Sequence, residues 1–431
     1  MSIKKNFSTL KNNKTALIAF FYTSSALLKT IISTASGFIV LFYVTPEELG
    51  VWQAFFIIAT YANFLNLGVP DGLNREIPFL QGKKNYLKAE QYASSAKFFS
   101  YICAALTLVT LIIGWIILDL KKSNNIELIS FIGVLSIVAI QFLNQYFVVL
   151  FRSNSAFKRF SYVNITQAAL LVLLFPLIIY QGILGYIFYQ IFTNLIFLIL
   201  LIVLSPIKVN AKFNIKDVKS LIQIGLPIFI MGFLNQMGKS IIKLAVLYFG
   251  GTVMLGVFAP VFAVINGVKI LPKTIARFFY PKFSFQLGEN GNTIQLWQSV
   301  RKIFIFLIVF LSIVFIPISI AMPYIIESFA PKYIDGVLPA QIVIFSTIVS
   351  ASFLGTHALN SMKAYKSRVV LSITYLSCAT IFPFSLPFII DDFIIAITLS
   401  IILTDVIYFI MSYFIVKNKL SSYMANNSII H

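Results

Sequence analysis

About twelve long apolar segments constrain this chain more than any other feature. Each is long enough to cross a hydrocarbon core ~30 Å thick at about 1.5 Å per residue. Of its 431 residues, 59% are hydrophobic and only 11% are charged, which no soluble fold accommodates. We therefore expect an all-α polytopic membrane protein. The segments cover about residues 16–43, 50–69, 97–119, 127–151, 160–180, 183–206, 221–249, 253–272, 300–323, 338–357, 369–390 and 393–416.

Basic residues gather at one end of these segments. The formal net charge is +19, and lysines and arginines concentrate at the N-terminus and in cytoplasmic stretches such as 70–97, 205–219 and Lys269 to Lys302, whereas the opposite connectors are mostly acidic. The positive-inside rule explains this asymmetry, so we expect both termini in the cytoplasm and no nucleic-acid partner. The first apolar segment exceeds the core of a cleaved signal peptide, so it is expected to stay as a membrane span.

Matching motifs occur in the same order in the two halves of the chain. The weakest pair is Arg75 with Arg277. The others are residues 29–32 (KTII) with 239–242 (KSII), 49–52 (LGVW) with 255–258 (LGVF), and 156–159 (AFKR) with 364–368 (AYKSR).

These matches predict a duplicated architecture. We expect an N-terminal six-helix bundle over 1–208, a cytoplasmic linker over 209–220 and a C-terminal six-helix bundle over 221–431. Because six is an even number, the second half enters the membrane in the same direction as the first, and the repeats are parallel.

Three lysines, Lys29, Lys239 and Lys243, lie well inside apolar segments, where one lysine costs roughly 2.5–3.5 kcal/mol on insertion scales. Lys239 and Lys243 are one turn apart and share a helix face. Under the predicted symmetry, Lys29 and Lys239 lie at matching depth on opposite walls. We interpret them as part of a solvated cationic cavity for an anionic ligand. The alternative is structural pairing with Asp405, the main intramembrane acid, although one acid cannot neutralise three lysines.

The residue types suggest what such a cavity would bind. Lysine is a compact point charge that tolerates varied phosphate geometry, as a diphosphate requires. Asn235 and Gln236 beside the lysines, and Gln145 in the fourth segment, add hydrogen-bonding groups suited to sugars. Ordinary hydrogen bonding between helices explains each of these side chains equally well.

Other charged residues are candidates for gating and coupling. Asp405 is a candidate site for an H+ or Na+ counter-ion, with a salt bridge to a cavity lysine as the alternative. Asp71, Arg75 and Arg277 are candidate cytoplasmic gate residues, with salt bridges at helix ends as the alternative. No motif for catalysis, a metal or a cofactor is present, so we expect no enzyme activity.

Two stretches carry a resemblance to a known family. Residues 66–69 (NLGV) through Asn74 and Arg75 are similar to the end of the second span in the polysaccharide transporter branch of the multidrug/oligosaccharidyl-lipid/polysaccharide exporters. Arg152 with 157–160 (FKRF) resembles the connection between its fourth and fifth spans. The resemblance extends over essentially the whole chain and is closest to the O-antigen flippases, with Asn66 at a position that is commonly acidic there.

The resemblance implies a MATE-like fold and a transport function. It implies that an undecaprenyl-diphosphate-linked oligosaccharide moves from the cytoplasmic to the periplasmic leaflet of the bacterial inner membrane, by alternating access driven by a counter-ion. The implied partners are the lipid-linked glycan, membrane lipids and a polysaccharide polymerase or chain-length complex. The alternatives are a MATE-like ion-coupled drug antiporter, a peptidoglycan-precursor flippase, and a membrane glycan polymerase or glycosyltransferase, which usually has a larger external loop.

Overall fold

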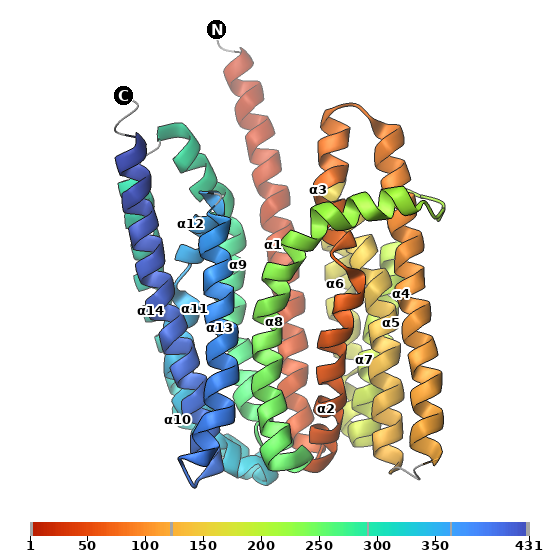
Figure 1. The fold of residues 1–431 in the computed structure, drawn as a ribbon, viewed down its shortest axis with the longest axis vertical. Helices are drawn as coiled ribbons and strands as arrows, with labels where there is room; N and C mark the ends of the chain where they lie inside the picture. The colour runs from red at the N-terminus through yellow and green to blue at the C-terminus, as the bar shows by residue number, and fades with distance from the viewer. Residues whose placement is uncertain (1–2, 121–123, 291–292, 363, 428–431) are drawn as a thin grey trace. The chain divides into compact units, whose positions relative to one another are not determined.

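The computed structural model describes residues 3–120, 124–290, 293–362 and 364–427, which form helices and no β-strand (Figure 1). Within these ranges, ten spans are long and apolar enough to cross a membrane. An all-α, multi-pass architecture is therefore confirmed. The elements are α1 (Ile3–Tyr43), α2 (Pro46–Ala62), η1 (Asn63–Asn66), α3 (Val69–Gly82), α4 (Tyr86–Leu120), α5 (Asn125–Ser153), α6 (Phe157–Leu173), α7 (Phe175–Val203), α8 (Ile215–Val257), α9 (Ala259–Asn290), α10 (Thr293–Phe329), η2 (Pro331–Gly336), α11 (Val337–Ser352), α12 (Gly355–Ser361), α13 (Tyr365–Ser385), η3 (Leu386–Phe388) and α14 (Phe393–Asn427).

Helix breaks shorten two of the expected spans, 50–69 and 160–180. The helix α2 ends at Ala62, where the backbone tightens into the 3₁₀ turn η1. Leu67 then adopts a left-handed φ of 49°. The helix α6 ends at Leu173, and α7 restarts with Pro176 in its first turn. Each shortened helix has 17 residues, which cover about 26 Å and are at the lower limit for a membrane span.

Large apolar side chains cover the outer faces of several helices. On α4, Leu106, Ile112 and Ile113 are about half exposed, and on α10 Ile313 is 68% exposed. A bilayer makes such exposure favourable, because apolar side chains there meet lipid tails instead of water. The polar exceptions inside the spans are therefore the residues that require an explanation.

The helices form two compact units. Unit 1 is Met1–Tyr43 with Ile58–Ile230, and unit 2 is Val44–Ile57 with Met231–His431. The division departs from the expected boundaries in two segments. The expected linker 209–220 and the start of α8 belong to unit 1, whereas the start of α2 belongs to unit 2.

Glycines explain why α8 begins in unit 1. A Cβ on Gly225 would collide with the carbonyl oxygen of Gly68 and lie 2.6 Å from the backbone nitrogen of Gly72. A Cβ on Gly72 would in turn collide with the Leu221 carbonyl oxygen. The first stretch of α8, green in Figure 1, runs crosswise to α3 and α4. Only glycines allow its backbone to approach α3 so closely.

A second pair of glycines holds the start of α2 in unit 2. A Cβ on Gly50 would collide with the carbonyl oxygen of Thr252, and a Cβ on Gly256 with that of Pro46. Gly50 and Gly256 are the glycines of the matched LGV motifs, so the repeated motif serves a reciprocal backbone contact.

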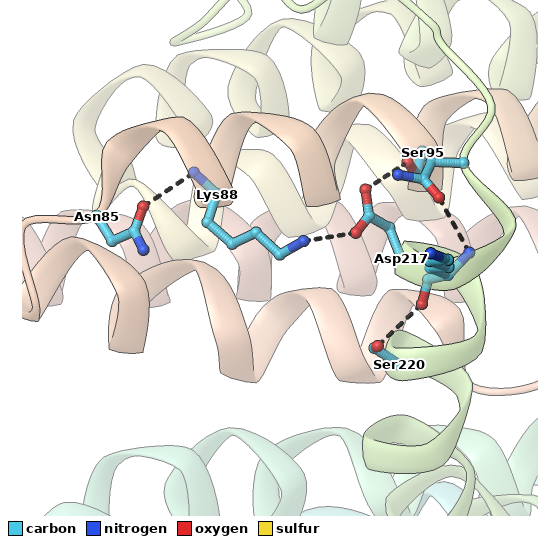
Figure 2. Close-up of polar contacts among 7 residues, drawn as sticks. Asn85, Lys88, Ser95, Asp217 and Ser220 are labelled. Carbon is cyan, nitrogen blue, oxygen red and sulfur yellow. Dashed lines mark hydrogen bonds and ion pairs between the residues drawn. The ribbon is translucent and has the colours of Figure 1, made fainter.

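An ion pair and hydrogen bonds fasten the linker to α4 in unit 1. Figure 2 shows Lys88 of α4 reaching Asp217 in the first turn of α8, with 2.7 Å between Nζ and Oδ1. The hydroxyl of Ser94 donates to the Asn210 carbonyl at 2.6 Å and accepts from the Lys212 backbone N–H at 2.9 Å. Asp217 is 3% exposed, so this attachment is partly buried.

Candidate functional site

Two adjoining cavities in unit 2, of about 210 and 70 Å³, bring together lysines from two helices. They share Lys239 of α8, Lys269 of α9, Tyr375 of α13 and Asp405 of α14. Asp405 is the one acidic side chain that lines either cavity in the described part of the chain. Four lysines therefore face one carboxylate, the other two being Lys243 and Lys273.

The lysines of α8 line this space because they are one helical turn apart. Lys239 lines both cavities and is exposed to solvent. Within the described residues its ammonium group has no hydrogen bond or ion pair. Lys243 lines the smaller cavity, where its Nζ lies 4.6 Å from the centroid of the Phe262 ring. An aromatic face stabilises a cation without neutralising its charge.

The helix α9 supplies two further lysines that sequence reasoning missed. Lys269 and Lys273 were assigned to the cytoplasmic connector, but α9 continues unbroken past both, and both line the larger cavity. Their i, i+4 spacing repeats that of the α8 lysines, and this was the signal that could have identified them. Lys269 makes an ion pair with Asp405, with 3.9 Å between Nζ and Oδ1.

Aromatic and polar groups complete the larger cavity. The rings of Tyr375 and Tyr408 lie 5.4 Å apart, edge to face. Asn235 lines the cavity, and its Nδ2 donates to Ser372 Oγ at 3.0 Å. Gln236 is exposed and lines neither cavity.

The remaining predicted cavity residues belong to unit 1. Lys29 is half-buried, and its Nζ lies 3.7 Å from the centroid of the Phe197 ring on α7. An aromatic face therefore stabilises this lysine, as Phe262 stabilises Lys243. Gln145 donates to Asn63 Oδ1 at 2.9 Å and accepts from Asn66 Nδ2 at 3.1 Å. This amide cluster holds the turn between α2 and α3.

Asp71 and Arg75, the two candidate gate residues whose side chains are described, do not pair with each other. Among the described side chains, neither Asp71 nor Arg75 has an ion pair, and Arg75 is exposed. Burial raises the pKa of the Asp71 carboxyl above its ordinary value, and the positive charge of Arg152 partly opposes this. The Arg277 side chain lies outside the described residues.

Comparison with known proteins gives a family and a fold. The sequence profile of a family described as "Polysaccharide biosynthesis protein" matches residues 43–329. No curated protein matches the sequence.

Three solved structures share the fold at low sequence identity. An inward-facing multidrug resistance MATE family transporter of the MOP superfamily is 14% identical, with a TM-score of 0.75 over 94% of this chain and 99% of the other. An outward-facing structure of such a transporter is 14% identical, with a TM-score of 0.64 over 95% and 96%. A MOP superfamily transporter from Pyrococcus furiosus, described as having a binding pocket of reverse polarity, is 14% identical, with a TM-score of 0.64 over 94% and 96%.

The profile match covers about two thirds of the chain, and the structural matches extend over nearly all of it. The chain belongs to the polysaccharide biosynthesis protein family and is a multi-pass membrane protein with the fold of the MATE transporters.

Proposed function

We propose that this protein is a flippase for an undecaprenyl-diphosphate-linked oligosaccharide, such as an O-antigen repeat unit. It moves the glycan and its diphosphate from the cytoplasmic to the periplasmic leaflet of a bacterial inner membrane by alternating access. The lipid tail stays in the bilayer, and a proton or sodium ion supplies the driving force. Membrane lipids surround the protein, and a polymerase or chain-length complex receives the product.

One observation carries the proposal: among the described residues, four lysines and a single carboxylate line the cavities of unit 2. A lysine inside an apolar helix is unfavourable unless water or an anion reaches it. The excess of positive charge therefore favours an anionic ligand, and lysine suits a diphosphate that has to bind and then leave. The tyrosine pair and Asn235 in the same cavity suit the adjoining sugar, because sugars bind through hydrogen bonds and aromatic faces.

The family supports the polysaccharide part of the proposal, and the fold supports a transporter. The structural relatives described as multidrug transporters make a drug antiporter the main competing function. A cationic drug would be repelled by the lysines of unit 2, because one carboxylate offsets the charge of only one of them.

The test compares a strain that lacks the gene with its parent. Its lipids are extracted, and undecaprenyl-diphosphate-linked oligosaccharide is quantified beside surface polysaccharide. Accumulation of complete repeat units with loss of surface glycan is the expected result, and a plasmid copy should reverse it. No accumulation with intact surface glycan would refute the flippase and favour the antiporter. Single units that reach the periplasmic leaflet but remain unpolymerised would indicate a polymerase.

A further inference from the structure

The carboxylate of Asp405 is loosely held for a charge so deeply buried. The residue is 4% exposed and lies mid-helix in α14. Thr347 Oγ1 donates to its Oδ2 at 3.2 Å, and Lys269 Nζ lies 3.9 Å from its Oδ1, which is beyond hydrogen-bonding distance. An ionised carboxylate has about four acceptor positions, so most of the capacity of this group is unused by these two contacts.

The same chain contains a tight ion pair for comparison. Lys88 and Asp217 approach to 2.7 Å at the linker, and Ser95 Oγ lies 3.4 Å from the second carboxylate oxygen (Figure 2). That geometry is what a structural pair requires, because a buried charge is costly unless it is closely paired. The Lys269–Asp405 pair is longer, and it lies at the wall of a cavity and not in a closely packed contact between helices.

Charged and titratable groups from four further helices line the cavities around Asp405. The helix α11 contributes the uncharged Thr347, which donates a hydrogen bond to Asp405. Beside Tyr408 of its own helix, the groups are Lys239 and Lys243 of α8, Lys269 and Lys273 of α9, His357 of α12 and Tyr375 of α13. Any cation that binds Asp405 therefore competes with a lysine ammonium already beside it. Any anion that binds Lys269 competes with Asp405.

We propose that Asp405 is a tethered counter-anion that partly neutralises the lysine site when the site is empty. An anionic group, such as a diphosphate, displaces it from Lys269, and the released carboxylate then takes up a proton or a sodium ion from solution. Anion binding and cation binding at this site therefore promote each other, which makes the cation at Asp405 distinct from the counter-ion that drives transport in the proposed function. The inference rests on the proposed function only in taking the natural anion to be the diphosphate of a lipid-linked glycan.

The test measures binding of inorganic pyrophosphate to the purified full-length protein in nanodiscs by isothermal titration calorimetry. Asp405→Asn keeps the shape of the side chain and removes its charge. We expect this variant to bind pyrophosphate at least about tenfold more tightly than the wild type, because a negative charge within about 4 Å of the site is removed. Asp391→Asn makes the same change in an exposed turn and should leave the affinity unchanged. Adding Lys269→Met to Asp405→Asn should abolish most of the gain.

Unchanged or weaker binding by a folded Asp405→Asn protein would overturn the proposal. So would the absence of pyrophosphate binding in the wild type and the variants. Folding is checked by size-exclusion chromatography and thermal unfolding.

If Asp405→Asn does not fold, the wild-type protein is titrated with sulfate, whose charge is constant between pH 6 and 8. The affinity of the protein for sulfate should rise as the pH falls, or as sodium replaces choline at fixed ionic strength. A sulfate affinity that changes with neither the pH nor sodium would contradict the proposal. The lipid accumulation assay does not depend on these titrations, so each idea can fail alone.

Discussion

Removing either partner of the Lys88–Asp217 pair should destabilise the protein, and by unequal amounts. Asp217 is 3% exposed, whereas Lys88 is 37% exposed. Lys88→Met leaves a buried carboxylate whose remaining side-chain neighbour is Ser95 Oγ at 3.4 Å. An unpaired buried charge costs about 3–5 kcal/mol.

The opposite substitution should cost much less. In Asp217→Asn, the ammonium group of Lys88 can turn into solvent, so no buried charge remains. What is lost is a half-exposed ion pair and a negative charge in the first turn of α8, together about 1 kcal/mol. The double variant should also be close to Asp217→Asn alone, because it no longer contains the unpaired carboxylate.

Thermal unfolding in detergent micelles measures these differences. At about 1 °C per kcal/mol for a chain of 431 residues, Lys88→Met should lower the unfolding temperature by about 3–5 °C. Asp217→Asn should lower it by about 1 °C, and the double variant should recover most of the loss in Lys88→Met. The reasoning is refuted if Lys88→Met is no worse than Asp217→Asn, or if the double variant is the least stable of the three.

Three further predictions follow from unit 1. Asn66→Asp removes the donor to Gln145 and should lower stability by about 1–3 kcal/mol in urea unfolding, whereas an unchanged midpoint would mean that the amide cluster contributes little. Gly225→Ala should destabilise by about 1–3 kcal/mol or more, because its Cβ would meet the backbone of Gly68; a wild-type unfolding temperature would contradict this contact. Asp71→Asn should raise the unfolding temperature at pH 7 but not below about pH 4, where both states are protonated. A carboxyl group whose pKa is raised by burial destabilises the folded protein only when it is ionised. If Asp71→Asn changed the unfolding temperature equally at both pH values, the buried charge would be excluded as the cause.

The sequence predicted the all-α, multi-pass architecture, because the length of an apolar segment follows directly from the thickness of the bilayer. It missed the breaks at Asn63–Asn66 and Leu174, because the expected spans ran through the two asparagines of the first break and through the unbroken apolar run of the second. It could not indicate that the start of α2 joins unit 2, since this depends on the backbone contact between Gly50 and Gly256. The repeated glycines were visible as a motif, but their partners were not.

The candidate site was only partly predictable. The i, i+4 spacing of Lys239 and Lys243 indicated a shared face, and both line the smaller cavity. Lys269 and Lys273 were missed because they lie at the expected end of their span, residue 272, and were therefore counted among the basic residues of the cytoplasmic side. That Asp405 pairs with Lys269 required the packing of both α9 and α14 against α11, which no local pattern encodes.

A translocation assay in liposomes tests the central claim most directly. Purified protein is reconstituted with a lipid-linked diphosphate oligosaccharide that carries a fluorophore on its sugar, and a membrane-impermeant reagent then bleaches the exposed label. The wild type should expose the label of both leaflets, and Lys219→Met, an exposed lysine of α8, should match it. Lys239→Met should leave the inner-leaflet label protected, as in protein-free liposomes. Full bleaching with Lys239→Met, or protection with the wild type, would contradict the account.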